Sequence, residues 1–216
     1  MMADQTSIAV SPAGEVVVAQ VSAEEYMARY AADHYEWVKG AVIKMTPVSL
    51  KHDNLRHYLR QLLDAYFSLN PIGVVIGEPF VMRLETTDSY REPDLQVLLN
   101  SNPSKLTDTA LLGPADICIE VVSPESVARD YGEKFEEYEK GGVGEYWIID
   151  PAREVCHFYR LQESKLYTVC SPDEQGFYRT RRLPHLVLHV PTLWQEKLPD
   201  FFAIGQAVQD MIKENK

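Results

Sequence analysis

The sequence predicts a mixed α/β domain, and three observations lead to this prediction. Strand-like runs of apolar residues occur at four places in the middle of the chain: Gly73 to Leu84, Pro93 to Leu99, Ile117 to Val122 and Glu145 to Asp150. Between and before these runs, apolar residues recur with helical spacing. No internal repeat and no low-complexity linker divides the 216 residues. One domain in which helices and strands mix fits this order best.

The N-terminal part is predicted to add an arm, a helix and a hairpin. Residues 1–20 mix small and polar residues with the run Val16-Val17-Val18, so we expect an arm or a peripheral strand there. Ser22 and Glu25 have the spacing of a capping box, which predicts the start of a helix. Lys39-Gly40 separates two short apolar runs, as in a β-hairpin. The main domain is therefore expected over residues 21–198.

The longest helix is predicted from Ser49 to Leu69, where apolar residues recur every three or four positions until Asn70-Pro71 ends the pattern. A second helix should open at Ser123-Pro124-Glu125 and stop at Gly141-Gly142. The remaining predictions are a polar loop at residues 100–114, strands at 155–161, 166–169 and 177–183, and a C-terminal helix at 199–216.

Composition excludes several classes of protein. No run of about 18 apolar residues is present, so we expect no membrane span, and the N-terminus lacks the pattern of a signal peptide. Cys118, Cys156 and Cys170 show no metal-ligand spacing and are expected to be buried thiols of a cytoplasmic protein. The net charge of −11 argues against general binding of nucleic acid, although it leaves room for a local basic groove.

Two carboxylates stand out because they lie in runs suited to the core. Glu120 is flanked by Ile119 and Val121, and Asp94 follows Pro93 at the start of another run. A buried carboxylate must be protonated, paired or bound to a cation. Two such groups on adjacent strands repel each other unless a cation bridges them, and Mg²⁺ favours oxygen ligands. For Asp94 alone, a plain turn position is the alternative.

Lys134 is predicted to point toward the sheet. Val127, Tyr131 and Tyr138 share its face of the second helix, because these residues follow one another at steps of three or four. An inward lysine requires a carboxylate, a backbone acceptor or a bound anion. Asp130, four residues upstream, is one such carboxylate. The alternative is that Lys134 reaches the carboxylates at the ends of the strands.

Together these groups suit the metal-dependent hydrolysis of a phosphoester. The metal ion would activate a water molecule and neutralise charge that develops on the phosphate. Lys134 would orient this water, help to deprotonate it, or stabilise the developing charge. His52 opens the long helix, where it is either a surface or capping residue, or a residue that contacts a phosphate or positions water. The other histidines show no spacing of zinc ligands.

Three motifs carry a resemblance to a known family. They are Ile119-Glu120-Val121-Val122-Ser123-Pro124-Glu125-Ser126, then Asp130 with Lys134 and Tyr138, and lastly Gly142 to Pro151, which keeps the signature GV-EYW-(I/V)-(I/V)-DP. With them, the chain resembles the Uma-type family of restriction-endonuclease-like proteins, part of the PD-(D/E)xK nuclease superfamily. The resemblance covers about residues 33–190.

This resemblance implies a restriction-endonuclease-like core, in which helices flank a mixed central sheet, with the N-terminal hairpin and helix as an extension. It implies that Asp94 and Glu120 bind the metal, Mg²⁺ or Mn²⁺, with the backbone carbonyl of Val121 as a further ligand. The lysine usual in the superfamily would stand at Val122. In this family its place is taken by a lysine on the following helix, which matches Lys134.

The leading hypothesis is therefore a Mg²⁺-dependent DNA endonuclease, and a homodimer follows by analogy with the superfamily. The resemblance also gives His52 a place in the site, because it matches a histidine at the start of the family's core helix. One alternative is a catalytically inactive protein that binds partners and keeps Lys134 in a structural ion-pair cluster. Another is hydrolysis of RNA or a nucleotide. A basic rim around the carboxylates would favour a nuclease over the interaction protein.

Overall fold

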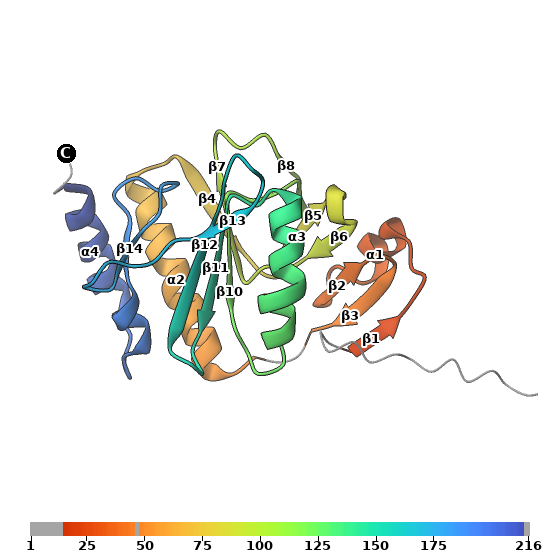
Figure 1. Ribbon diagram of the computed structural model, residues 1–216, viewed down its shortest axis with the longest axis horizontal. Coiled ribbons are helices and arrows are strands. Elements are labelled where there is room, and N and C mark those ends of the chain that lie inside the picture. The colour runs from red at the N-terminus through yellow and green to blue at the C-terminus, as the bar shows by residue number, and fades with distance from the viewer. Residues whose placement is uncertain (1–14, 46–47, 214–216) are drawn as a thin grey trace, which may run out of the picture.

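The central sheet is mixed, as predicted. The computed structural model describes residues 15–45 and 48–213, so most of the arm predicted for residues 1–20 lies outside the described part. The sheet has the strand order β13-β12-β11-β10-β7-β4, and only β10 and β11 are parallel within it (Figure 1). Its strands are β4 (Gly73–Gly77), β7 (Leu95–Leu99), β10 (Ile117–Val121), β11 (Glu145–Asp150), β12 (Val155–Leu161) and β13 (Tyr167–Val169).

A second sheet carries the predicted N-terminal hairpin, β2–β3. Its order is β1-β3-β2-β6-β5-β9-β8, with β1 (Glu15–Val18), β2 (Tyr35–Val38), β3 (Ala41–Lys44), β5 (Val81–Leu84), β6 (Ser89–Arg91), β8 (Lys105–Leu106) and β9 (Ala110–Leu112). Helix α1 (Ala23–Arg29) covers this sheet, and the hydroxyl of Ser22 accepts a hydrogen bond from the amide of Glu25 as half of the expected cap. Strands β14 (Phe177–Arg179) and β15 (Val187–His189) form a separate pair.

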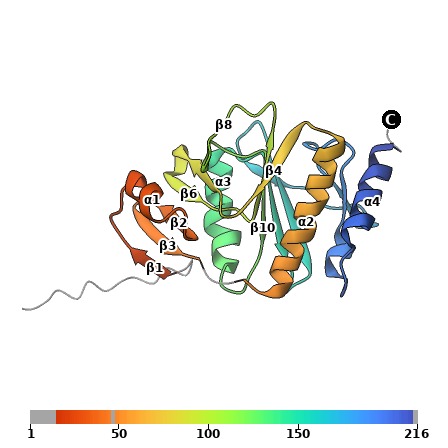
Figure 2. The same ribbon diagram turned by 180° about the vertical axis from the view of Figure 1, so that it is seen from behind.

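Helices cover both faces of the central sheet. On one face lies α2 (Leu50–Leu69), capped by Ser49 and flanked by α4 (Phe201–Lys213), and on the other lies α3 (Lys134–Gly141), as Figures 1 and 2 show. A π-helical turn, η2 (Arg129–Glu133), leads into α3, and short 3₁₀ turns stand at η1 (Glu85–Thr87) and η3 (Val190–Trp194). Among the described residues, no helix has the length and apolarity to cross a bilayer.

Alternation along β10 decides which residues face α3. Ile119 and Val121 belong to the core beneath α2, whereas Cys118 and Val122 belong to the core beneath α3. Side chains of a strand point to opposite faces in turn. Glu120 therefore points toward α3, the helix that carries Lys134.

Two predicted segments differ from the structure. The run Gly73 to Leu84 was expected to be one strand, but it contributes β4 to the central sheet and β5 to the second one. Pro79 stands between them, and a proline has no amide hydrogen for a strand ladder. The loop predicted at residues 100–114 contains β8 and β9, because Ala110–Leu112 pairs in parallel with β5. Apolar periodicity alone does not tell which sheet a strand joins.

Glu145 explains much of the signature that begins at Gly142. Its side chain is wholly buried, and its two carboxylate oxygens accept hydrogen bonds from Trp147 Nε1 (3.1 Å), Tyr178 Oη (2.9 Å) and Arg160 Nε (3.2 Å). A buried carboxylate with three donors satisfies its hydrogen-bonding capacity inside the core. This part of the signature therefore holds β11 to β12 and β14.

The close packing of β4 against β7 gives a stability prediction. In Gly73→Ala, the new Cβ would lie 2.5 Å from the carbonyl oxygen of Leu98, a backbone atom held in the ladder. We expect the free energy of unfolding in urea to fall by about 1–3 kcal/mol. Gly205→Ala in α4 is the matched control, because its Cβ meets no atom within 4 Å. It should gain about 0.5–1 kcal/mol, and equal effects of the two changes would contradict the packing described.

Candidate active site

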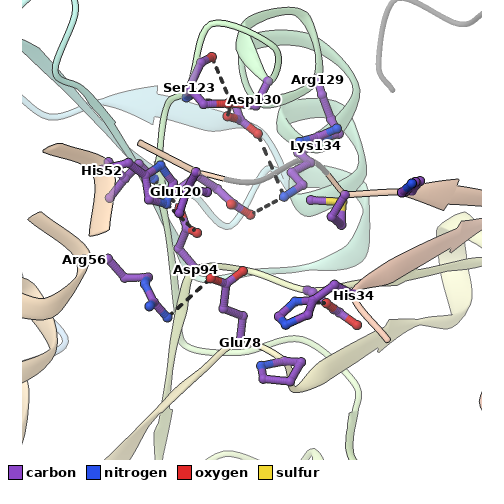
Figure 3. Close-up of a pocket in the computed structure, with 17 residues that line it drawn as sticks. His34, His52, Arg56, Glu78, Asp94, Glu120, Ser123, Arg129, Asp130 and Lys134 are labelled. Carbon is purple, nitrogen blue, oxygen red and sulfur yellow. Dashed lines mark hydrogen bonds and ion pairs between the residues drawn. The ribbon is translucent and has the colours of Figure 1, made fainter. Parts of the chain in front are cut away.

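A cavity of about 640 Å³ lies where the ends of β7 and β10 meet the N-terminal sheet. The side chains that line it come from α2, from the turn into α3 and from both sheets (Figure 3). All five residues singled out in the sequence are among them: His52, Asp94, Glu120, Val121 and Lys134. The fold thus brings together groups that are far apart in the chain.

Lys134 is buried and meets three carboxylates. Its Nζ lies 2.8 Å from Oε1 of Glu120, 3.2 Å from Oε1 of Glu36 and 3.9 Å from Oδ1 of Asp130. The hydroxyl of Tyr138 donates a second hydrogen bond to Oε1 of Glu120, at 2.8 Å. The sequence left two partners open for Lys134, Asp130 on its own helix and the carboxylates at the strand ends. The ion pair with Glu120, at the end of its strand, is the closer contact. Asp130 is the most distant of the three partners.

Asp94 is buried at the start of β7 and closes the end of the β7–β10 pair. Its Oδ2 accepts a hydrogen bond from the amide of Val121 at 2.6 Å, and its Oδ1 lies 3.1 Å from Nε2 of His52. A plain turn residue would face solvent, but Asp94 is only 6% exposed. The Asp94 carboxylate therefore takes the place of a backbone carbonyl as the acceptor for the Val121 amide at this end of the β7–β10 pair.

His52 lies in the first turn of α2 and is buried rather than exposed. Burial alone would lower the pKa of His52, but the hydrogen bond and the charge of Asp94 raise it above its ordinary value. Its Nδ1 is buried without a hydrogen-bond partner in the described structure. Within the cavity, the imidazole of His52 thus makes its hydrogen bond to Asp94.

Asp130 is held by a second local contact. The hydroxyl of Ser126 donates a hydrogen bond to Oδ2 of Asp130, and the same hydroxyl oxygen accepts one from the amide of Ser123 at 2.9 Å. The other oxygen, Oδ1, is buried and accepts no hydrogen bond in the described structure. Asp130 therefore presents one unsatisfied acceptor among the groups that line the cavity.

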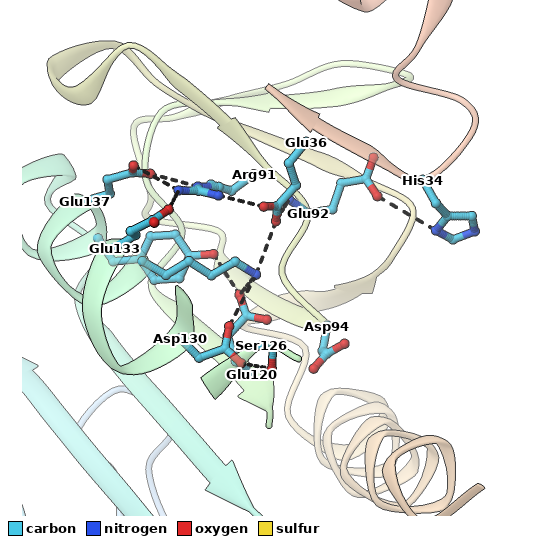
Figure 4. A network of polar contacts seen from close by, with 12 residues as sticks. His34, Glu36, Arg91, Glu92, Asp94, Glu120, Ser126, Asp130, Glu133 and Glu137 are labelled. Atoms are coloured by element: carbon cyan, nitrogen blue, oxygen red, sulfur yellow. Dashed lines mark hydrogen bonds and ion pairs between the residues drawn. The ribbon is translucent and has the colours of Figure 1, made fainter. Parts of the chain in front are cut away.

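Glu36, on β2, belongs to the site although sequence reasoning did not identify it. It is wholly buried, and Arg91 Nη1 donates to its Oε2 at 2.7 Å while Lys134 approaches its Oε1 (Figure 4). Arg91 in turn donates two hydrogen bonds to Glu137, at 2.8 and 2.9 Å. The signal was present in the sequence, because Glu36 interrupts an apolar strand beside Trp37, as Glu120 does in its own strand.

The buried charges have opposite effects on one another. Burial alone would raise the pKa of Glu36, but Lys134 and Arg91 lower it well below its usual range. Burial alone would lower the pKa of Lys134, but Glu120, Glu36 and Asp130 raise it above its usual range. Burial raises the pKa of Glu120 to about 8 although Lys134 opposes this shift. Lys134 is therefore a protonated, fixed cation.

The cavity as a whole is slightly acidic. Five carboxylates line it against four lysine and arginine side chains, which gives a formal charge of −1 with neutral histidines. Within the described ranges, no three His, Cys, Asp or Glu side chains are arranged closely enough to hold a metal ion by themselves. An ion bound here would complete its shell with water or substrate oxygens, as Mg²⁺ usually does.

The network around Arg91 gives a second prediction. Arg91→Met leaves Lys134 as the remaining ion-pair partner of the buried Glu36 carboxylate, so we expect a loss of about 3–5 kcal/mol in the free energy of unfolding. Adding Glu36→Gln should recover part of this loss. Arg29→Met, on the exposed surface of α1, is the control and should change stability by less than about 1 kcal/mol. Losses that simply add in the double variant would contradict the proposed coupling.

Glu92 gives a prediction about pH. Burial, together with Glu36 and Glu78, raises the pKa of Glu92 from 4.5 to about 8. Between these values the folded protein binds more protons than the unfolded chain, so the contribution of Glu92 to stability is greatest below pH 4.5 and is lost as the pH rises to about 8.

In Glu92→Gln the carboxyl group is replaced by an amide that does not titrate, so the variant does not lose this contribution to stability as the pH rises. In the presence of a chelator, we expect the stability of the variant relative to wild type to increase by more than about 1 kcal/mol between about pH 5 and pH 8.5, measured by urea unfolding. The exposed Glu163→Gln should leave the pH profile unchanged. Parallel profiles for Glu92→Gln and wild type would show that Glu92 does not titrate as described.

Comparisons with known proteins place the chain in a family. The fold is similar to that of a crystal structure from Anabaena variabilis, titled "a putative nuclease belonging to DUF820", with a TM-score of 0.67 and 19% sequence identity over 82% of this chain and 97% of that one. Among curated proteins, none matches the chain. Residues 23–190 match the Uma2 family, described as "Putative restriction endonuclease". This match confirms the resemblance found in the sequence: the chain belongs to the Uma2 family of restriction-endonuclease-like proteins.

Proposed function

We propose that this protein is a Mg²⁺- or Mn²⁺-dependent endonuclease that hydrolyses phosphodiester bonds of DNA. The observation that supports this most is the convergence of Asp94 and Glu120, from neighbouring strands, with the ammonium of Lys134 in one cavity. Two carboxylates and one fixed cation are the groups that a metal-assisted attack on a phosphate needs. Membership of a family of nuclease-like proteins supports the same reaction class.

The residues present fit a divalent metal ion. Asp94 and Glu120 supply hard oxygen ligands, and the carbonyl of Val121 is the third donor we propose. The register pairs Ile119 with Leu95, so Val121 comes opposite Pro93, which has no amide hydrogen to donate across the strands. When bound, the ion would lower the pKa of a coordinated water and neutralise charge on the phosphate.

Lys134 acts, in this proposal, as a cation and not as a base. Three carboxylates hold it protonated, so its role is to orient the attacking water or to stabilise the phosphate in the transition state. Val122, at the position usual for the lysine, packs in the apolar core beneath α3. The ammonium group of the site therefore comes from Lys134 on α3, because Val122 after β10 cannot supply one.

His52 is proposed as a positioning residue for Asp94. Its Nε2 lies within hydrogen-bond distance of one carboxylate oxygen, and the amide of Val121 holds the other. Partners of this kind orient metal-binding carboxylates. A direct contact from His52 to phosphate is not needed in this arrangement.

The basic side chains of the cavity lining would favour a polyanionic substrate only together with a bound metal ion. Lys44, Arg56 and Arg129 line the cavity in addition to Lys134. One bound Mg²⁺ would change the formal charge of the lining from −1 to +1, so the site would favour phosphate only when the metal is present. Such a local charge is compatible with the overall net charge of −11.

A cytoplasmic location and a homodimer complete the proposal. All three cysteines are free thiols in the described structure, which fits a reducing compartment. The homodimer rests only on analogy with nucleases that cut both strands. An inactive interaction protein remains the second candidate, because the pairing of Lys134 with Glu120 and Glu36 would also serve as a structural cluster.

Metal binding and cleavage separate these candidates. Wild type should nick supercoiled DNA with Mg²⁺ or Mn²⁺, and Asp94→Asn and Glu120→Gln should each weaken Mn²⁺ binding at least about tenfold. Lys134→Met should keep metal binding and lose about 10²-fold or more in cleavage rate. Asp64→Asn, on the exposed side of α2, is the control.

The outcome that would overturn the nuclease is specific. If wild type binds no divalent metal, or if Asp94→Asn and Glu120→Gln bind it as wild type does, the proposed metal site is wrong. If metal binds there but duplex DNA, single-stranded DNA and RNA all stay intact, the interaction protein is the better description.

A further inference from the structure

We propose that a slot between α2 and the segment from Leu193 to Pro199 binds a nucleotide. The slot has a volume of about 570 Å³, is lined by these two parts of the chain alone, and shares no lining residue with the active-site cavity. Its volume lies within the range of about 300–1,000 Å³ that is usual for small-molecule sites. The binding of a nucleotide there does not require the nuclease proposal to be correct.

Part of the lining is apolar and aromatic. Leu55 and Leu193 are almost fully buried, and Tyr58 is buried beside them. Trp194 packs against the same core but stays partly exposed. Every nucleobase has a flat face that stacks on aromatic side chains. The indole of Trp194 is therefore the surface on which we expect the base to stack.

Three polar side chains of α2 line the slot and have no hydrogen-bond partner among the described residues. Asn54, His57 and Gln61 follow one another at steps of three and four, so they share one face of the helix. An amide side chain offers a donor and an acceptor side by side, as the edge of adenine does. Two accessible amides beside an aromatic ring favour a nucleobase over a purely apolar ligand.

The charge of the slot suits a phosphate. Lys51 and Lys197 line it against Glu196, which gives a formal charge of +1 with neutral histidine, in a chain whose net charge is −11. Neither lysine forms an ion pair with a described residue. Lys51 donates one hydrogen bond to the carbonyl oxygen of Pro151, at 2.8 Å, and its ammonium has two further donors. A phosphate could therefore contact the lysines without breaking an ion pair.

The slot and the active-site cavity lie on different sides of α2. His52 and Arg56 line the active-site cavity, whereas Asn54 and Gln61 line the slot. Because an α-helix turns once in about 3.6 residues, these two pairs project from roughly opposite faces. Two sources can supply a nucleotide at this place: a free mononucleotide, or one nucleotide of a nucleic-acid strand that passes the end of α2. The recognition chemistry is the same for both.

The test measures the binding of deoxyadenosine monophosphate by isothermal titration calorimetry, with a chelator present so that no metal ion contributes. Asn54→Ala and Gln61→Ala should each weaken binding about three- to tenfold, because each removes a hydrogen bond to the base. Gln206→Ala is the matched control, since it removes an exposed helix amide outside the slot. Deoxyribose 5-phosphate, which lacks the base, should bind at least about tenfold more weakly than the nucleotide.

Trp194 gives a second readout. Stacking of the base on its indole should quench the tryptophan fluorescence of wild type. Trp194→Phe keeps a ring for stacking, so it should keep most of the binding but lose the quenching, because Trp37 and Trp147 are buried. Quenching that persists in Trp194→Phe would mean that the nucleotide binds elsewhere.

A single-stranded oligodeoxyadenylate identifies the source of the nucleotide. If Asn54→Ala and Gln61→Ala weaken the binding of this strand, the slot holds a nucleotide of a nucleic acid. If they weaken the binding of the mononucleotide alone, the slot takes the free ligand. If they change neither, or if the sugar phosphate binds as well as the nucleotide, the proposal is wrong. Because no metal ion is present, none of these results depends on the proposed metal site.

Discussion

The buried ammonium of Lys134 is the interaction on which the rest of the site depends. It joins Glu120 on the central sheet to Glu36 on the N-terminal sheet, while the lysine itself belongs to the helix between them. Arg91 extends the same chain of charges from Glu36 back to α3 through Glu137. Each buried charge is stable only because its partners are in place, so the two sheets and the helix hold one another in register.

The buried carboxylates of this arrangement lower the stability of the fold, but they are groups that could bind a cation. Burial leaves more carboxylates than cations around the cavity, and the pKa of both Glu92 and Glu120 is raised because their ionised forms lack enough compensation. A sequence selected only for stability would replace such groups with apolar ones. A cation, as proposed for this cavity, would supply the charge that folding leaves uncompensated.

Local patterns in the sequence predicted most of the helices and strands and indicated some of the residues of the candidate site. Glu120 and Lys134 could be found because each breaks an apolar pattern of its own strand or helix. The contact between Glu36 and Arg91 could not be predicted from local patterns, because the two residues lie 55 positions apart and meet only through the pairing of β2 with β6. The split of Gly73 to Leu84 between two sheets has the same origin: periodicity gives the faces of a strand but not its neighbours.

The signature from Gly142 to Pro151 and the proposed chemistry occupy different parts of the molecule. The Glu145 carboxylate accepts hydrogen bonds from Trp147, Tyr178 and Arg160 inside the core. The Asp150 carboxylate accepts hydrogen bonds from the amides of Ala152 and Arg153 in the turn after β11. Neither carboxylate lines the cavity. The most recognisable stretch of the sequence thus specifies the scaffold. Because this stretch holds strands together and contributes no side chain to the cavity, it carries no argument about the reaction, which has to be argued from the residues that line the cavity.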